Sequence, residues 1–373
     1  MKKFNEEILG KITRKEVLSF EPYVPGKPID ELKRELNFTE VYKLASNENS
    51  LGVSEKIINE IPEMLKNIYR YPDSNSFVLR QALSKKLNIP EENFLFGNGS
   101  DEVIELMGKT FLTEDDEIIM SEHSFVRYKM AADLMGAKTL FSKMTDFYKV
   151  DLKNMASLIT EKTKIVFISN PNNPTGTFVA EKELKNFLQN IPENVLVFLD
   201  EAYLEFAYKS SGYPKSLELL NEFPNLLVSR TFSKLHALAG LRIGYLIGDK
   251  GIIDTINRIK PPFNVNIIAQ NIAKISLEDN EHITKSLEMI EKGKKYLYEE
   301  FKKLNIKFFE TSANFIMFHA GSLGGKELFK KLLLKGIIIR ALDEYDLRSF
   351  ARVSIGKKEE NEKFIEALKE VYK

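Results

Sequence analysis

Short apolar runs alternate with amphipathic stretches over residues 90–250 of this chain. The apolar runs have the length of buried strands and cover residues 93–97, 116–120, 138–142, 164–169, 194–200, 225–230 and 243–248. The segments between them, such as 125–135 and 180–189, have the length and apolar spacing of helices. Strands that alternate with helices predict an α/β fold, in which a mostly parallel central sheet is flanked by helices on both faces.

The pattern changes after residue 263, where two long stretches, 265–277 and 281–304, carry the apolar stripe and charged face of helices. Further strand candidates lie at 306–310, 314–319, 336–340 and 350–356, with a helix near 326–334 and an amphipathic helix at the end. We therefore predict a large domain over 46–263 and a smaller α+β domain made of 1–45 and 264–373. The first 45 residues form an N-terminal arm, expected to pack on the small domain or on a partner chain.

The composition excludes several classes of protein. Lys plus Arg and Asp plus Glu both number 54, so the net charge of zero gives no reason to expect nucleic acid or an anionic membrane as partner. The chain has no cysteine, which excludes disulfides and thiolate chemistry, and its four histidines are too scattered to predict a metal site. The apolar runs are far shorter than the roughly 20 residues of a membrane span, and the first residues lack the features of a secretion signal. We expect a cytoplasmic location.

Two polar clusters follow predicted strands, at the edge of the sheet where ligands collect in open α/β folds. In "GNGSDE" (97–102) glycines precede a helix that starts near Ser100 and Asp101, so the free N–H groups could hold a phosphate. A plain helix cap after a turn would explain the same residues. In "SNPNNPTG" (169–176) two prolines and a glycine fix the backbone, which could direct Asn173 into a cleft, although an ordinary Asn-Pro turn is the alternative.

Two more clusters add charge to the same edge. Asp200 ends a strand of the buried type, where a carboxylate needs a donor or a cation, and Tyr203 lies three residues later. A helix-capping aspartate with a core tyrosine is the alternative. In "TFSKLHALAGLR" (231–242) the hydroxyls of Thr231 and Ser233, the amine of Lys234 and the guanidinium of Arg242 stand among small, uncharged residues, where a surface lysine is the alternative.

Taken together, the four clusters meet the needs of pyridoxal 5′-phosphate. The aldehyde of this cofactor reacts with a lysine, its ring nitrogen needs a facing aspartate, and its ring oxygen needs donors such as Tyr203 and Asn173. Its phosphate needs N–H groups, hydroxyls and an arginine. If these residues had no common function, the separate structural explanations given for the four clusters would all have to be true at once.

The order of "SNPNNPTG", "DEAY" and "TFSKLHALAGLRIGY" resembles the signature of the fold-type I pyridoxal-phosphate-dependent aminotransferases. More narrowly, "PYVPGKPIDELKREL", "KLASNEN", "YRYPD" and "FARVSIG" resemble the histidinol-phosphate aminotransferase family, and the resemblance runs from about residue 20 to 370. It implies that Lys234 is the Schiff-base lysine, Asp200 the partner of the ring nitrogen, and Tyr203 and Asn173 the donors to the ring oxygen. It implies a phosphate site made of Gly99, Ser100, Asp101, Thr231, Ser233 and Arg242.

The same resemblance implies a homodimer with shared active sites, because Tyr71 matches a tyrosine that reaches the cofactor phosphate of the other subunit. Phe125 matches an aromatic residue that stacks on the cofactor ring, and it departs from the tyrosine of many relatives. "NENSLG" (47–52) departs from the family by lacking the usual proline after the second asparagine, so we expect a small backbone difference there.

The implied reaction is a two-step amino transfer between histidinol phosphate and 2-oxoglutarate, in which the amine of Lys234 moves the proton at the substrate α-carbon. Arg352 matches the arginine for an α-carboxylate, and Arg340 with Tyr23 of the other subunit are candidates for the substrate phosphate. Arg348 competes with them, and Asn47 and Glu48 are expected near the substrate or the entrance. The alternatives are an aromatic amino-acid aminotransferase, a decarboxylase of a phosphorylated amino acid and a non-catalytic cofactor-binding protein.

Overall fold

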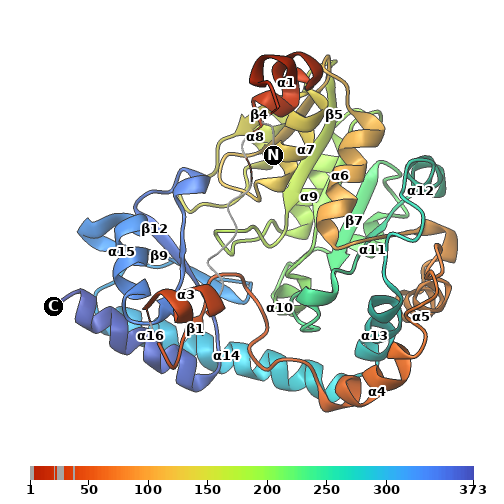
Figure 1. Cartoon of the computed structure of the whole chain (residues 1–373). Helices are drawn as coiled ribbons and strands as arrows, with labels where there is room; N and C mark the ends of the chain where they lie inside the picture. The colour runs from red at the N-terminus through yellow and green to blue at the C-terminus, as the bar shows by residue number, and fades with distance from the viewer. Residues whose placement is uncertain (1–3, 21, 23–28, 37) are drawn as a thin grey trace.

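The computed structural model describes residues 4–20, 22, 29–36 and 38–373. Figure 1 shows two bodies side by side, one built on a seven-stranded sheet and one on smaller sheets. The long helix α14 (Asn280–Lys303) runs from one body to the other along one edge of the molecule.

The strands of the large sheet follow the order β2-β8-β7-β6-β5-β3-β4, and every strand except β8 runs in the same direction. Their bounds are Phe94–Gly97 (β2), Glu117–Ser121 (β3), Lys138–Ser142 (β4), Thr163–Ser169 (β5), Leu196–Asp200 (β6), Leu226–Thr231 (β7) and Gly244–Ile247 (β8). All seven strands predicted from the sequence are therefore present, and the predicted mostly parallel sheet is confirmed.

Helices cover both faces of this sheet because its central strands contain continuous apolar runs, which place apolar side chains on both faces. Ile165 and Phe167 of β5 share one core with α6 and α7, whereas Val166 and Ile168 share another with α9. The helices of the large body are α6 (Ser100–Phe111), α7 (Arg127–Met135), α8 (Leu152–Ser157), α9 (Glu181–Gln189), α10 (Leu204–Ala207), α11 (Ser216–Leu219) and α12 (Lys250–Asn257).

A third core lies beyond β2 and β8, at one edge of the sheet. There α4 (Glu55–Leu65), α5 (Phe77–Leu87) and α13 (Ile267–Leu277) bury Ile57, Leu83 and Ile272 against Phe94. The packing of α13 against these helices favours a domain boundary nearer the start of α14 than residue 263. The domain limits themselves stay a prediction.

The small body holds a three-stranded antiparallel sheet of order β11-β12-β9 and a parallel pair of β1 and β10. The strands are β1 (Tyr42–Lys43), β9 (Phe315–His319), β10 (Ile337–Ile338), β11 (Arg340–Ala341) and β12 (Phe350–Ser354), and α14 packs with α15 (Gly324–Leu333) and α16 (Lys358–Val371) around them. The predicted strand at 306–310 is wrong, since only Phe308 forms an isolated bridge there. The predicted strand at 336–340 is split between β10 and β11.

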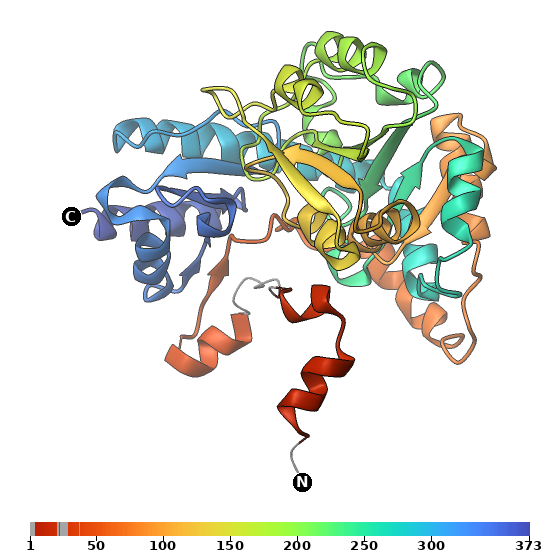
Figure 2. The same ribbon diagram turned by 90° about the horizontal axis from the view of Figure 1, so that it is seen from above.

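The N-terminal arm begins with α1 (Glu6–Ile12) and α2 (Lys15–Leu18), which project from the rest of the molecule in Figure 2. Arg14 donates a hydrogen bond to the carbonyl of Leu134 in α7 (2.7 Å), so this part of the arm contacts the large body. The later helix α3 (Ile29–Leu36) contacts the small body instead, because Leu32 packs with Ala45 and Ile338.

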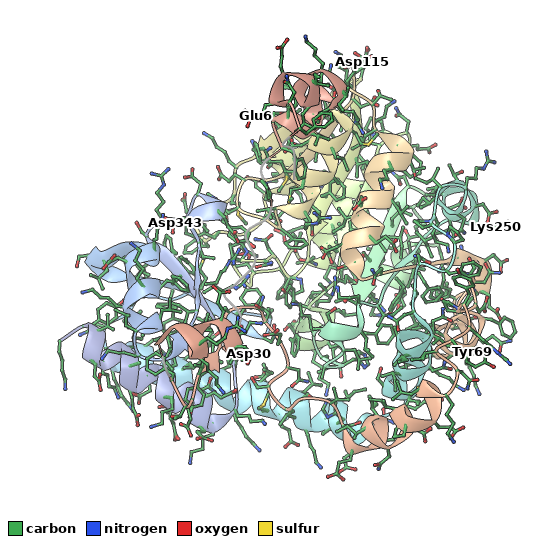
Figure 3. All side chains as sticks on the ribbon, in the orientation of Figure 1. Glu6, Asp30, Tyr69, Asp115, Lys250 and Asp343 are labelled. Carbon is green, nitrogen blue, oxygen red and sulfur yellow. The ribbon has the colours of Figure 1, made fainter. Side chains whose placement is uncertain are left out.

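Charged side chains of both signs project from the outside of the molecule, as Glu6, Asp30, Asp115, Lys250 and Asp343 do in Figure 3. This distribution agrees with the net charge of zero. Within the described ranges, no helix has both the length and the apolar character needed to cross a bilayer. The expected cytoplasmic location stays a prediction.

Candidate active site

A cavity of about 390 Å³ opens at the carboxyl ends of the large sheet, on the side that faces the small body. Strands β5, β6 and β7 are parallel neighbours, and their register pairs Ser169 with Asp200 and Asp200 with Ser229. The polar residues that follow these strands therefore meet at one edge, as the sequence predicted. Thirteen of the predicted site residues line the cavity: Asn47, Ser100, Asp101, Phe125, Asn173, Asp200, Tyr203, Thr231, Ser233, Lys234, Arg242, Arg340 and Arg352.

Asp200 is a buried carboxylate at the floor of this cavity, with 3% of its surface exposed. Its Oδ2 accepts a hydrogen bond from the hydroxyl of Tyr128 (2.7 Å), and its Oδ1 accepts one from the backbone N–H of Ala202 (3.1 Å). Burial raises the pKa of Asp200 to about 6, although both hydrogen bonds act in the opposite direction. A cationic group bound in front of Asp200 would oppose this effect of burial and lower the pKa again, because it supplies a counter-charge.

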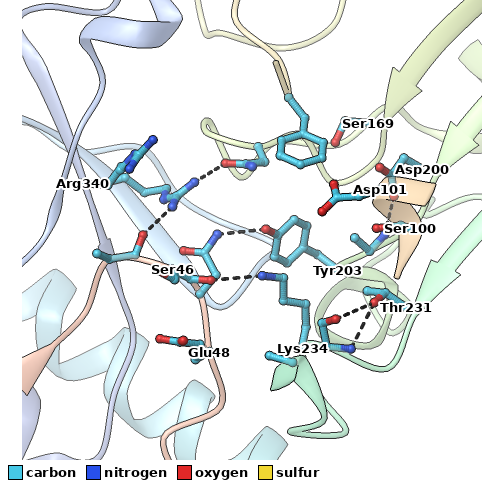
Figure 4. Close-up of a pocket in the computed structure, with 18 of the residues that line it drawn as sticks. Ser46, Glu48, Ser100, Asp101, Ser169, Asp200, Tyr203, Thr231, Lys234 and Arg340 are labelled. Atoms are coloured by element: carbon cyan, nitrogen blue, oxygen red, sulfur yellow. Dashed lines mark hydrogen bonds between the residues drawn. The ribbon is translucent and has the colours of Figure 1, made fainter. Parts of the chain in front are cut away.

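Lys234 lies after β7, where the amine can reach the middle of the cavity (Figure 4). Its Nζ donates to the carbonyl oxygen of Ser46 (3.1 Å) and lies 5.6 Å from the ring centre of Tyr203. The hydroxyl of Tyr203 accepts a hydrogen bond from the side-chain amide of Asn47 (2.9 Å). Both of these contacts of the amine are with uncharged groups, which is suited to a group that exchanges partners.

The opposite end of the cavity has the features of an anion site. The helix α6 starts at Ser100, and Gly99 before it has a φ of +78°, so the first N–H groups of the helix point toward the cavity edge. Arg242 sits beside them and pairs with Asp101 (3.2 Å). A Cβ at Gly99 would lie 2.4 Å from Nη2 of Arg242, so a larger residue at this position would displace the guanidinium from its present place.

The hydroxyls of Thr231 and Ser233 lie next to the anion site. Thr231 donates to the Oγ of Ser233 (3.0 Å), and the N–H of Ser233 donates back to the Oγ1 of Thr231 (3.1 Å). Thr231 is paired with Gly244 on the neighbouring strand β8, whose backbone lies close to Ser100. The register of the sheet thus brings residues 99–101, 231–233 and 242 together although they are distant in the chain.

Arg352 of β12 reaches the cavity from the small body. It is 5% exposed, and it donates to two uncharged acceptors, the side-chain oxygen of Asn173 and the backbone oxygen of Ala45 (2.7 Å for the latter). Its Nε is buried without a hydrogen-bond partner in the described part of the chain. A buried guanidinium with neutral neighbours and an unsatisfied donor fits the binding of a carboxylate.

Arg340 of β11 lies directly across from Arg352 in the antiparallel pair of strands, and both line the cavity. Unlike Arg352, Arg340 forms a bidentate ion pair with the carboxylate of Glu344. The competing candidate, Arg348, has a side chain that is 81% exposed and does not line the cavity, as a solvated loop arginine would. Glu48 lines the cavity and pairs with Lys43 (2.7 Å).

Tyr71 and Tyr23 are predicted to act on the other subunit of a dimer. Tyr71 does not line this cavity; its ring is exposed and stacks on Phe263, with 4.8 Å between ring centres. Tyr23 lies outside the described residues.

The sequence reasoning missed Tyr128, whose hydroxyl is fully buried against Asp200. Tyr128 follows Phe125 by one helical turn, and their rings make an edge contact (5.7 Å between centres). That spacing was the only available signal, and it could not reveal a partner 72 positions away.

Comparison with known proteins agrees with this geometry. Residues 39–368 match the family model for aminotransferase class I and II. The chain is 43% identical to a histidinol-phosphate aminotransferase of Moorella thermoacetica, over 96% of this chain and 92% of the relative.

Two crystal structures of histidinol-phosphate aminotransferases share the fold. That of Clostridium acetobutylicum has a TM-score of 0.82 and 30% identity, with 89% of this chain and 99% of that chain covered. That of Sinorhizobium meliloti, a complex with pyridoxal 5′-phosphate, has a TM-score of 0.89 and 23% identity, with 96% and 97% covered. The predicted fold-type I architecture and family are thus confirmed, and the chain belongs to the aminotransferase class I and II family and, within it, to the histidinol-phosphate aminotransferases.

Proposed function

We propose that this chain is a pyridoxal-phosphate-dependent aminotransferase that moves an amino group between histidinol phosphate and 2-oxoglutarate. The observation that carries the proposal is the meeting of Lys234, Asp200 and Arg352 in one cavity of a chain 43% identical to a histidinol-phosphate aminotransferase. An amine, a buried carboxylate and a buried guanidinium are the groups that a cofactor-dependent amino transfer needs.

The described residues fit the cofactor at both ends. Gly99 and the start of α6 leave a cradle for a phosphate, with Arg242 and the Thr231 and Ser233 hydroxyls beside it. Asp200, whose pKa burial raises to about 6, suits a cationic ring nitrogen, while Phe125, Tyr203 and Asn173 would contact the ring and its oxygen. When bound, pyridoxal phosphate supplies an aldehyde that takes up amines and a cationic ring that stabilises negative charge at the substrate α-carbon.

The role of each side chain follows from its position in the cavity. The Nζ of Lys234 would take the proton from the α-carbon of the amino donor in one half-reaction and deliver a proton to the α-carbon of the amino product in the other. The carbonyl of Ser46 holds this amine when it is not engaged. Asp200 stays ionised against the ring nitrogen, aided by the Tyr128 hydroxyl. Asn173 uses its oxygen for Arg352, which leaves its NH₂ group as the donor toward the ring oxygen.

The two arginines would hold the ends of the substrates. Arg352 would bind the α-carboxylate of glutamate, which histidinol phosphate lacks, so this residue chiefly serves glutamate. Arg340 would bind the distal anion, namely the phosphate of one substrate or the side-chain carboxylate of the other. Tyr23 of a second subunit and Asn47 are expected to complete this end.

A homodimer with shared sites is part of the proposal. Several exposed apolar residues lie close to Tyr71 in the sequence, and Tyr69 projects from the outer edge of the molecule (Figure 3). They are Ile68, Tyr69, Phe77 and Val78, and the partly exposed Phe263 stacks on Tyr71 itself. Exposed apolar surface of this kind is typical of a protein interface.

Mixing two inactive variants tests the shared site. Lys234→Ala and Tyr71→Ala dimers, unfolded and refolded together, should regain activity, because each mixed dimer has one complete site. Activity that stays at the level of the separate variants would contradict the sharing.

The function itself is tested with the purified protein and the cofactor. Binding should give a visible absorbance band that histidinol phosphate bleaches and 2-oxoglutarate then restores, and Lys234→Ala should abolish turnover while the protein stays folded. Bleaching by phenylalanine in preference to histidinol phosphate would favour an aromatic aminotransferase, and release of carbon dioxide would favour a decarboxylase.

A further inference from the structure

Arg340 and Arg352 stand opposite each other on β11 and β12, yet their surroundings differ in charge. Among the residues that the structure describes, Arg352 donates to uncharged acceptors only. The fork of Arg340 is instead bound to a carboxylate: its Nε lies 3.0 Å from Oε1 of Glu344, and its Nη2 contacts Oε2. Like charges placed directly opposite on a sheet destabilise it, so one counter-ion at this pair has a structural reason. The counter-ion, however, serves only one of the two arginines.

We propose that Glu344 is a specificity-determining residue that lowers the affinity of the Arg340 end of the cavity for anions, and for phosphate dianions above all. Glu344 belongs to the short 3-10 turn η4 (Asp343–Tyr345), and the next residue, Tyr345, lines the cavity. The side chains of Arg340 and Glu344 are 13% and 25% exposed, so water and salt screen this pair only in part. An anion that approaches Arg340 therefore also meets the negative charge of Glu344.

The repulsion grows with the charge of the ligand, because the Coulomb energy is proportional to the product of the charges. Glu344 therefore weakens the binding of a phosphate with two negative charges more than the binding of a carboxylate with one. This inference rests on the proposed function, in which the same cavity must bind a phosphate-bearing substrate in one half-reaction and a dicarboxylate in the other. Without Glu344, the balance of affinities would shift toward the phosphate-bearing ligand and away from the dicarboxylate.

The test compares Glu344→Gln with the native holoenzyme, in which the cofactor fills its own phosphate site. The substitution keeps the shape and one oxygen acceptor but removes the charge. The dissociation constants of inorganic phosphate and of glutarate, an unreactive dicarboxylate, are measured at pH 8 by calorimetry. We expect the constant for phosphate to fall by about 3- to 10-fold and that for glutarate by about 2-fold or less, as for one partly screened charge.

Two further variants make the result specific. Asp346→Asn removes a charge two residues away, from a side chain that is 83% exposed, and should leave both constants unchanged. Arg340→Gln combined with Glu344→Gln should abolish the gain, because the two residues act as one unit.

Unchanged phosphate binding in Glu344→Gln would overturn the proposal. Weaker binding would overturn it too, and would show that Glu344 orients Arg340. These measurements involve no turnover, so a failure of histidinol phosphate as substrate would refute the proposed function and leave this comparison to decide on Glu344.

Discussion

Replacing Tyr128 by Phe removes one hydroxyl from the floor of the cavity and leaves the ring in place. The ring of Tyr128 stacks on Phe167, with 4.8 Å between centres, and this contact does not need the hydroxyl. The lost hydrogen bond is the one donated to Oδ2 of Asp200 (2.7 Å). A hydrogen bond to a charged group contributes about 1.5–3 kcal/mol, whereas one between neutral groups contributes about 0.5–1.5 kcal/mol.

The effect of the substitution should depend on pH, because Asp200 changes its charge. In the folded protein the pKa of Asp200 is raised to about 6 from its ordinary 3.8, so the ionised carboxylate opposes folding as the pH rises through 6. Tyr128 reduces this penalty while Asp200 is charged. Without the hydroxyl the pKa of Asp200 should rise further, and the loss of stability should be about 1 to 2 kcal/mol larger at pH 8 than at pH 5.

The measurement is urea unfolding of the cofactor-free protein at both pH values and at one protein concentration. Tyr298→Phe is the control, since its hydroxyl accepts a hydrogen bond from the backbone N–H of Thr311 (2.6 Å) and touches no carboxylate. Its loss of stability should be the same at both pH values. If Tyr128→Phe also lost the same amount at pH 5 and pH 8, the assignment of the hydroxyl to the charged form of Asp200 would be refuted.

The cofactor and substrate sites each allow a further test. Gly99→Ala should raise the dissociation constant of the cofactor at least about 10-fold, because its Cβ would lie 2.4 Å from Arg242 at a residue with φ +78°. Gly52→Ala is the control for the backbone effect alone, since Gly52 has φ +76° and its Cβ would meet no atom within 4 Å. Equal effects of the two substitutions in a spectroscopic titration would count against the phosphate cradle at Gly99. Arg352→Ala should raise the KM for glutamate far more than that for histidinol phosphate in steady-state assays, since only glutamate carries an α-carboxylate; similar increases for both would show that Arg352 has another role.

The sequence predicted the large sheet well because its strands are short apolar runs with polar residues at their carboxyl ends. Val166 to Ile168 in β5 and Val197 to Leu199 in β6 are apolar at every position, as strands covered on both faces must be. The wrong strand at 306–310 has the same apolar character, but it forms only an isolated bridge between Phe308 and Phe318 and no continuous ladder. The hydrophobic pattern of a segment indicates whether it is buried. Whether the segment pairs as a strand depends on its neighbour in the fold, which the pattern does not reveal.

In the candidate site, too, residues in unusual local patterns could be predicted, whereas residues that depend on distant partners could not. Lys234, Asp200 and Asn173 could be predicted because each stands in a local pattern that is unusual by itself. Tyr128 and Glu344 could not, because an aromatic residue in a helix and a glutamate in a turn are ordinary. Their importance comes from Asp200, 72 positions away, and from the fork of Arg340.

The contacts of Arg352 explain why the cavity needs both bodies of the molecule. Its guanidinium, on β12, holds the side chain of Asn173, which follows β5 of the large sheet. A second contact joins the same loop to another segment of the small body, since the N–H of Ser312 donates to the carbonyl of Gly176 (2.8 Å) and Thr311 packs closely against Gly176. The loop 169–176 is thus fixed by the small body at two places. A carboxylate that binds Arg352 is therefore placed relative to Asn173, and through it relative to the residues around Lys234, by contacts that exist before the ligand arrives.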